Sequence, residues 1–420
     1  MLLKQLLPLA AFLAKAALAQ DKLVFAHYIV GLTNGQSQDQ WQLDISQAIE
    51  SGIDGFALNI GSADSYNDVQ LTLAYETAES NDFLMFLSFD QAASTWSQDQ
   101  IVTYINNYKG YSSQAKVNNL PFVSTFEGPS SASIWPAVRD ATGGIFFVPD
   151  WSSLGASGVG AQSQYIDGAF NWGAWPNANV YTMDSGNDVA YQSALGSKAY
   201  MMGVSPYFYT DLPQYSKNWY SSSDSLWFDR WSEALEINPT YIEIITWNDY
   251  GESSYINAPV TAQIVSGAEG YINGFDHTAF RFVLPYFISA YKAGNTDVAV
   301  PTTGAMAWYR TTPKSVCGDG GTVWGQGGGA SATGGTEDVI SIIGLADSAQ
   351  SVQVQIGSGA VQTLTATKTA GKASFYQTSF DSQTGAVTIT YNGKSTIGPE
   401  ITNSCPSTGN VNFNSVAIQV

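Results

Sequence analysis

Two carboxylic acids three positions apart, Asp249 and Glu252, follow an apolar run in the stretch IITWNDYGES, residues 244–253. Only 12% of the 420 residues are charged, so two acids at the end of an apolar run are unusual. One protonated and one ionised carboxyl group can together break a glycosidic bond, by protonating the leaving oxygen and by activating water. This pair is therefore one candidate for such chemistry, and if it is the catalytic pair we expect Glu252 to be the general acid and Asp249 the base.

The sequence lacks the residue patterns that a metal site or a serine nucleophile would need. The two histidines, His27 and His277, are not spaced as a metal-binding pair, and no G-x-S-x-G elbow supplies a serine nucleophile. We expect no metal and no cofactor. Glu127, in STFEG, remains an alternative acid/base, because it closes the fourth apolar run, where retaining enzymes built on barrels can hold that group.

Polar and aromatic side chains also close the other apolar runs. Such side chains can hydrogen-bond sugar hydroxyls and stack on sugar rings, so we expect them to bind the substrate. The predicted substrate-binding residues are His27, Tyr28, Asn59, Asp90, Glu127, Asp150, Trp151, Trp172, Tyr207, Trp247 and Asn248.

Eight short apolar runs, each bounded by Gly, Pro, Asn or Asp, must position these residues. Apolar runs buried on both faces are typical of parallel strands, and helix-like segments such as QDQWQLDISQAIESG lie between several of them. This alternation predicts a (β/α)8 TIM barrel over residues 20–300, whose active site lies at the carboxyl ends of the strands. A doubly wound open sheet is the alternative, but no glycine-rich phosphate fingerprint follows the first run. The runs cover residues 23–31, 55–61, 83–90, 121–128, 144–151, 168–175, 199–206 and 241–249.

Charge and composition narrow the class of partner. The formal net charge is -19, from 35 acidic and 16 basic residues, so the phosphates of nucleic acid would be repelled. An uncharged partner escapes this repulsion, and 23 Tyr, 20 Phe and 12 Trp suit flat ligands such as sugar rings. We expect a carbohydrate partner, no nucleic acid and a monomer.

The two ends of the chain carry further signals. Residues 1–19 read as a signal peptide, with Lys4 before an apolar stretch that is too short to span a bilayer. We therefore expect a secreted protein, outside the cell or in its wall, with no membrane segment. Cys317 and Cys405 are the only cysteines, and in an exported chain they are expected to form a disulfide.

Residues 301–420 differ in composition from the rest. The segment 318–336 is rich in glycine and is predicted to be flexible, and the stretches after it alternate apolar and polar residues as antiparallel strands do. These patterns predict an accessory β-sandwich domain. Few aromatic residues occur there, so we favour a packing role over carbohydrate binding.

The chain resembles glycoside hydrolase family 71, the fungal α-1,3-glucanases or mutanases, over most of residues 20–300. The motifs that carry the resemblance are FAHYIVG, IDGFALNIG, FLSFD, STFEG, FVPDW, YMMGVSPYFYT, LWFDRW and EIITWNDYGES. The resemblance implies a (β/α)8 barrel followed by a β-sandwich, hydrolysis of α-1,3-glucan with inversion, and Asp249 and Glu252 as the catalytic pair. The alternative is a silent barrel that binds glucan as a lectin-like wall protein.

Overall fold

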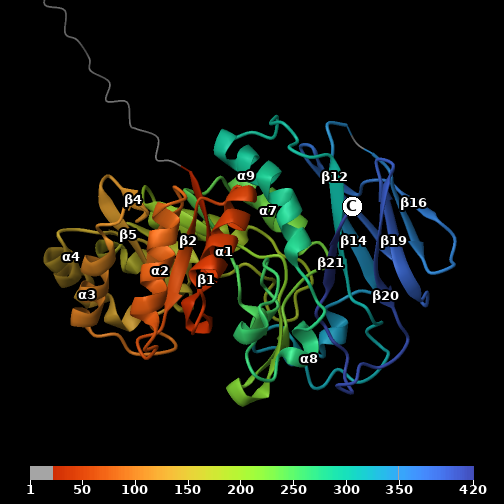
Figure 1. Ribbon diagram of the computed structural model, residues 1–420, viewed down its shortest axis with the longest axis horizontal. Coiled ribbons are helices and arrows are strands. Elements are labelled where there is room, and N and C mark those ends of the chain that lie inside the picture. The colour runs from red at the N-terminus through yellow and green to blue at the C-terminus, as the bar shows by residue number, and fades with distance from the viewer. Residues whose placement is uncertain (1–21, 349) are drawn as a thin grey trace, which may run out of the picture.

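A computed structural model describes residues 22–348 and 350–420, so the predicted signal peptide lies outside the described residues. Each of the eight predicted runs contains one strand of a single parallel sheet (Figure 1). The strands of this sheet lie side by side in the order β6, β5, β3, β2, β1, β11, β8, β7. The short β4 (Lys116–Val117) pairs antiparallel with β5. The parallel strands are β1 (Leu23–Ile29), β2 (Gly55–Ile60), β3 (Leu84–Asp90), β5 (Leu120–Phe126), β6 (Phe146–Phe147), β7 (Gly168–Asn171), β8 (Ala199–Val204) and β11 (Tyr241–Ile244).

The sheet curls until its two end strands, β6 and β7, approach each other. Asp150 lies between them and makes parallel bridges to Phe126 of β5 and to Phe170 of β7. The backbone N–H of Phe170 donates to the carbonyl of Pro149 at 2.9 Å, and that of Asp167 donates to Phe147 at 2.8 Å. The first strand, β1, pairs with the last, β11, on the opposite side.

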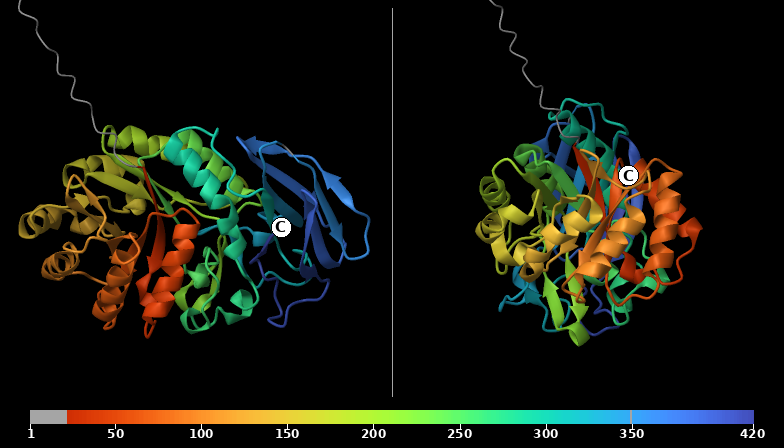
Figure 2. Two further views of the ribbon diagram at one scale, coloured as in Figure 1. Left: turned by 45° about the horizontal axis from the view of Figure 1, so that its top comes forward. Right: turned by 90° about the vertical axis from the view of Figure 1, so that its left-hand side faces the viewer.

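Helices connect and cover the parallel strands (Figure 2). Two of them begin at a serine whose side chain accepts an N–H of the first turn, Ser37 before α1 and Ser97 before α3. No helix in the described part of the chain is long and apolar enough to cross a membrane. The helices are α1 (Gln38–Glu50), α2 (Asn67–Glu79), α3 (Gln98–Tyr108), α4 (Trp135–Thr142), α5 (Gly155–Ala161), α6 (Gly186–Leu195), α7 (Leu226–Ile237), α8 (Glu269–Ile272) and α9 (Leu284–Ala293).

The inside of the curled sheet changes from apolar to polar along the strands. Phe25, Ala57 and Tyr241 belong to a buried apolar cluster near the amino ends of β1, β2 and β11. Side chains two positions further along a strand face the same way, which places His27, Asn59 and Glu243 above this cluster. The apolar layer thus forms the floor on which the polar residues at the carboxyl ends rest.

After α9 the chain forms two antiparallel sheets, which Figure 1 shows gathered at one end of the molecule. Apolar side chains of both sheets share one buried cluster, which includes Ile340 and Tyr376 from one sheet and Val354 and Ile389 from the other. The first sheet holds β17 (Lys368–Ala370), β18 (Ala373–Ser379), β14 (Val339–Leu345), β12 (Gly304–Tyr309) and β21 (Val416–Gln419), and the second holds β16 (Gln362–Leu364), β15 (Val352–Ile356), β19 (Gly385–Tyr391) and β20 (Lys394–Ile401). The chain is therefore a mixed α/β protein.

The glycine-rich segment 318–336 was predicted to be flexible, but part of it is an ordered strand. Its residues Val323–Trp324 form β13, which pairs with β10 (Lys217–Tyr220), and β10 pairs with β9 (Tyr209–Leu212). The N–H of Gly325 donates to Tyr220 at 2.8 Å, and a disulfide joins Cys317 to Cys405 as predicted. Backbone pairing to an edge strand orders a stretch whose composition alone suggests flexibility.

Candidate functional site

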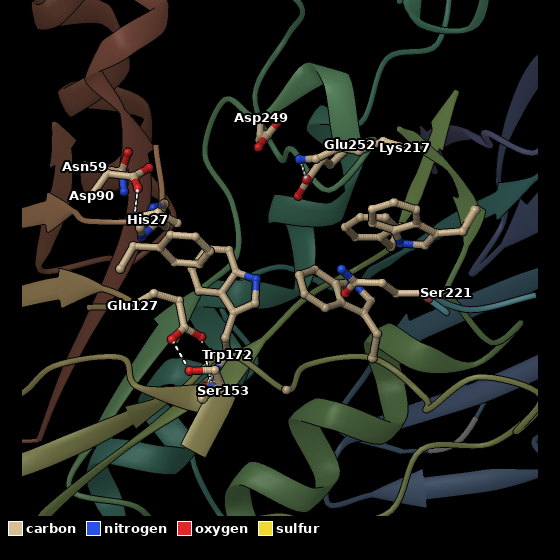
Figure 3. A pocket seen from close by; sticks show the side chains of 18 of the residues that line it. His27, Asn59, Asp90, Glu127, Ser153, Trp172, Lys217, Ser221, Asp249 and Glu252 are labelled. Carbon is tan, nitrogen blue, oxygen red and sulfur yellow. Dashed lines mark hydrogen bonds and ion pairs between the residues drawn. The ribbon is translucent and has the colours of Figure 1, made fainter. Parts of the chain in front are cut away.

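A cavity of about 880 Å³ opens at the carboxyl ends of the parallel strands (Figure 3). In Figure 3, Asp249 and Glu252 lie at one edge of this cavity, and Glu127 with Ser153 lies across it. The structure brings together seven of the predicted site residues in its lining. These are His27, Asn59, Asp90, Glu127, Trp172, Asp249 and Glu252.

A single turn of 3-10 helix explains the three-residue spacing of the acids. Asp249 is the residue before this turn, which spans Tyr250–Glu252. A 3-10 helix has about three residues per turn, so side chains at i and i+3 lie on one face. The N–H of Asp249 donates to Thr246 Oγ1 at 2.8 Å and anchors the start of the turn. Asp249 itself precedes the turn and has non-helical backbone angles, and both acids line the same cavity.

Asp249 and Glu252 have different surroundings. Burial and then the charge of Glu252 raise the pKa of Asp249 to about 7, against the lowering effects of Lys217 and of the Gly251 and Glu252 amides. Glu252 Oε1 lies 2.6 Å from Nζ of Lys217, and 14% of the Glu252 side chain is exposed. One acid of the pair is thus poised to hold a proton near neutral pH, and the other is ion-paired.

Glu127, across the cavity, is held by hydrogen bonds. Its Oε1 accepts the N–H of Ser153 at 2.9 Å, and its Oε2 accepts the hydroxyl of the same serine. Its φ of 54° is left-handed, and the next residue, Gly128, has a φ of 91°. A Cβ on Gly128 would lie 2.4 Å from the Gln91 side chain, so this tight turn requires glycine.

Below Glu127 lies a second carboxyl, that of Asp150. Its Oδ1 accepts the N–H of Ser152 at 2.9 Å and the Ser152 hydroxyl, whereas its buried Oδ2 has no hydrogen-bond partner. Burial, and to a lesser degree the charges of Glu127 and Glu243, raises its pKa well above the usual range, although Ser152 lowers it. Asp150 joins the ends of the sheet and is not part of the cavity lining.

His27 is fixed from below by Glu243, an acid that the sequence analysis did not single out. The Nδ1 of His27 lies 2.6 Å from Oε1 of Glu243, and both side chains are almost fully buried. Burial raises the pKa of Glu243, although His27 acts in the opposite direction. The pair locks the imidazole ring, which lies nearly perpendicular to the Trp172 ring with 4.8 Å between their centroids.

Aromatic rings extend from His27 along one wall of the cavity. The ring centroids of Trp172 and Trp175 are 6.3 Å apart, those of Trp175 and Phe208 are 4.8 Å apart, and Phe208 stacks on Trp219 at 5.8 Å. The indole N–H of Trp175 donates to Tyr207 O at 3.0 Å, which fixes its ring. Such a wall offers apolar faces against which sugar rings can stack.

Six of the predicted residues do not line the cavity. Alternation along β1 turns Tyr28 to the face opposite His27, so Tyr28 packs in the core outside the sheet, and Trp247, which follows β11, is buried in the same core. The Tyr28 hydroxyl donates to Asp44 at 2.7 Å. The Asn248 amide accepts the N–H of Ile29 and donates to the carbonyl of Ile29. All six are buried outside the cavity lining, and the full set is Tyr28, Asp150, Trp151, Tyr207, Trp247 and Asn248.

The cavity also contains residues that the sequence analysis missed. Lys217 and Trp219 come from β10, in a hairpin that follows the seventh run, and Gln326 comes from the glycine-rich segment. Ser152 and Ser153 follow β6. Ser152 donates to Asp150, and Ser153 donates to Glu127. Trp175 follows Trp172 by three residues, and among the missed residues this second tryptophan is the one that the sequence could have indicated.

Among residues 22–348 and 350–420, no group of three His, Cys, Asp or Glu side chains is arranged to hold a metal ion. The carboxyl groups instead act singly or in pairs, each beside a cation, a hydroxyl or an amide. Such groups can donate and accept protons and can hydrogen-bond an uncharged polar ligand.

Comparison with known sequences identifies relatives over most of the chain. The family described as Glycosyl hydrolase family 71 matches residues 20–420. Glucan endo-1,3-alpha-glucosidase agn1 of Schizosaccharomyces pombe is 40% identical, over 70% of this chain and 72% of its own length. Mutanase Pc12g07500 of Penicillium rubens is 36% identical over 73% of this chain and 69% of its own. Ascus wall endo-1,3-alpha-glucanase of S. pombe is 33% identical over 80% and 81%.

A solved structure shares the fold at low sequence identity. The GH99 endo-alpha-mannosidase of Bacteroides thetaiotaomicron, in complex with BIS-TRIS-Propane, superimposes with a TM-score of 0.54. The match covers 65% of this chain and 98% of that one, at 12% identity. At this identity the likeness concerns the fold alone.

Proposed function

Because the chain belongs to glycosyl hydrolase family 71, we propose that it hydrolyses the α-1,3-glucosidic bonds of α-1,3-glucan, as a glucan endo-1,3-alpha-glucosidase. The similar proteins named as endo-1,3-α-glucosidase, mutanase and ascus wall glucanase support this substrate. A substrate in fungal walls fits a protein that works outside the cell or in the wall. The predicted signal peptide, residues 1–19, agrees with that location.

One observation carries the mechanism: Asp249, just before a 3-10 turn, and Glu252, the last residue of that turn, both line the edge of an aromatic-walled cavity. In a direct displacement, one carboxyl protonates the glycosidic oxygen while the other takes a proton from the attacking water. The raised pKa of Asp249 supports a pair that holds one proton between its two members near neutral pH. Water attacks from the face opposite the leaving sugar, so the configuration at the anomeric carbon inverts.

The remaining lining residues hold the chain of sugars. His27, Asn59, Asp90 and Glu127 offer hydrogen-bonding atoms, and Trp172 with the aromatic wall offers stacking faces. Asp90 Oδ1 already accepts the N–H groups of Ala92 and Ala93 at 3.0 and 2.8 Å, which fixes its direction. We assign these residues to sugar binding.

For the architecture, we propose that the curled parallel sheet is a (β/α)8 barrel closed through Asp150, within residues 20–300. The shared apolar cluster between the two antiparallel sheets supports a β-sandwich over residues 301–420. The segment 318–336 belongs to the sandwich by sequence, but β13 attaches it to the cavity side of the barrel.

Three measurements test the proposed function. Purified protein incubated with insoluble α-1,3-glucan is expected to release reducing ends, and proton NMR of the first product is expected to show the β-anomer. The rate should follow a bell-shaped pH profile with an optimum below pH 7, since the acid must keep its proton while its partner is ionised. Binding to the glucan without release of reducing ends would instead favour the lectin-like alternative.

A further inference from the structure

Lys217 is the cation nearest to the catalytic pair, and it does not come from an end of a parallel strand. It begins β10, in the hairpin formed by β9 and β10 after β8. Its Nζ lies 2.6 Å from Oε1 of Glu252 and lines the same cavity (Figure 3). The hairpin is itself fixed on its other edge, because Trp219 and Tyr220 pair with β13.

The charges around Lys217 are all negative. Partial burial alone would lower its pKa, but the charges of Glu252, Asp249 and Asp90 outweigh this effect and raise it. Lys217 is therefore a cation over the whole working range of pH. Of these acids, Glu252 makes the direct contact, whereas Lys217 acts on Asp249 through space.

We propose that Lys217 decides which carboxyl of the catalytic pair holds the proton, by keeping Glu252 ionised and leaving the proton on Asp249. An ammonium group in contact with one carboxylate stabilises the charged form of that group more than the charged form of a more distant one. Asp249 is then the proton donor and Glu252 the base that activates water. These roles are the reverse of those expected from the sequence, and the inference rests on the proposed function.

The step balances with these roles. The bond between the anomeric carbon and the glycosidic oxygen breaks as Asp249 gives its proton to that oxygen. The oxygen of a water molecule bonds to the anomeric carbon, and Glu252 takes the proton that this water loses. The products are one reducing sugar and one alcohol, and the proton returns from Glu252 to Asp249 through solvent before the next turnover. Lys217 gains and loses nothing, so it is a positioning residue that acts through Glu252.

The test compares Lys217→Met with Lys217→Arg. The pH profile of kcat is measured on soluble α-1,3-linked glucose oligosaccharides, with thermal unfolding to verify the fold. Without the cation, the proton moves from Asp249 to Glu252 in most molecules, so the productive form becomes a minor species and Lys217→Met should lower kcat about 10- to 100-fold. It should also move the acid limb of the profile upward by about one pH unit or more. Lys217→Arg keeps the charge and should retain the limb and most of the activity.

Lys292→Met provides a matched control. Lys292 pairs with Asp54 at 2.6 Å, with 36% of its side chain exposed against 40% for Lys217, and Asp54 precedes β2 at the opposite end of the strands. The loss of this ion pair should leave the pH profile unchanged. An unshifted profile in Lys217→Met, with only KM raised, would overturn the inference and leave Lys217 as a sugar-binding residue.

A substrate whose leaving group hardly needs protonation assigns the roles directly. α-Nigerosyl fluoride has an α-1,3 bond between two glucose units and a fluoride leaving group. For each variant, the activity on this fluoride is divided by its residual activity on oligosaccharides. This ratio should be far higher for Asp249→Asn than for Glu252→Gln. Preferential rescue of Glu252→Gln would overturn the inference while the proposed function stands. If the wild-type protein released no reducing ends from α-1,3-glucan, the proposed function itself would fail.

Discussion

Two pairs of acids lie on opposite sides of the site, Asp249 with Glu252 at one edge of the cavity and Glu127 with the buried Asp150 across from them, and the pairs differ in what holds them. Glu127 is bound by the N–H and hydroxyl of Ser153, and Asp150 by the N–H and hydroxyl of Ser152. Asp249 and Glu252 instead share a short turn, and Glu252 contacts a lysine. Hydroxyl and amide donors fix a carboxylate in place, whereas a neighbouring acid and a cation prepare a pair for proton transfer. Residue type alone does not distinguish the two pairs.

The largest expected effect separates the pairs by activity. Asp249→Asn and Glu252→Gln are nearly isosteric and should each lower kcat by two orders of magnitude or more, because general acid and base contributions are about 10²- to 10⁴-fold. Glu127→Gln removes only a sugar-binding charge and should cost less than about 10-fold. Initial rates of reducing-end release measure all three.

Glucan binding by the inactive variants serves as the control for this comparison. Asp249→Asn and Glu252→Gln should still bind α-1,3-glucan in a pull-down assay. Full loss of activity in Glu127→Gln, with activity retained in Asp249→Asn and the α-anomer formed first, would move the catalytic pair to Glu127 and Glu252.

A smaller effect concerns stability, and it should have a defined pH dependence. The folded-state pKa of Asp249 is about 7, whereas an aspartate in the unfolded chain titrates near ~3.9. The folded state therefore binds the proton more tightly, and the free energy of unfolding falls as pH rises from about 4 to 7. Asp249→Asn should remove this loss and raise Tm at pH 7.5 but not near pH 4.

The stability gain in Asp249→Asn should be about 1–2 kcal/mol at pH 7.5, below the roughly 4 kcal/mol of three full pKa units because solvent reaches the carboxyl. Thermal unfolding at the two pH values measures it. Glu127→Gln provides the contrast, since it weakens the bonds to Ser153 and should lower Tm slightly. Equal Tm changes for Asp249→Asn at pH 4 and pH 7.5 would contradict the linkage.

Ser153→Ala should have a weaker effect on the rate. It removes the hydroxyl that binds Glu127 but keeps the backbone N–H, so the carboxylate stays near its place. We expect kcat to change by less than about 5-fold, in line with the loss of one hydrogen bond of about 1 kcal/mol. The anomeric form of the product should stay the same, and NMR measures it alongside the rate. A 100-fold loss would show that the position of Glu127 matters to the chemistry itself.

Chelation should have no effect. In the proposed mechanism, both acid pairs act through protons and hydrogen bonds, so the rate after dialysis against EDTA should equal that of the untreated protein. Loss of activity that an added divalent cation restores would show that one of the pairs binds a metal.

The parallel strands could be predicted from the sequence because they depend on local patterns of apolar residues. The eight apolar runs each contain a parallel strand, since residues buried on both faces of a sheet must be apolar. Alternation along β1 also implies that His27 and Tyr28 point to opposite faces, so only one of these neighbours could line the cavity. Stricter use of this rule would have shortened the predicted set of binding residues, whereas Trp247 and Asn248 lie beyond the end of β11, where the rule does not apply.

The sequence by itself determined the catalytic candidates, the strands that carry them and the pairing of two cysteines. Only the tertiary structure decided the neighbours of these groups. Lys217 meets Glu252 across 35 positions of sequence, and Gln326 reaches the cavity because β13 pairs with β10. Such contacts depend on how hairpins and loops pack in three dimensions, and no local periodicity encodes them. The ionisation of a carboxyl depends on charges and burial within a few ångströms, so the roles that we propose for Asp249 and Glu252 rest on this packing.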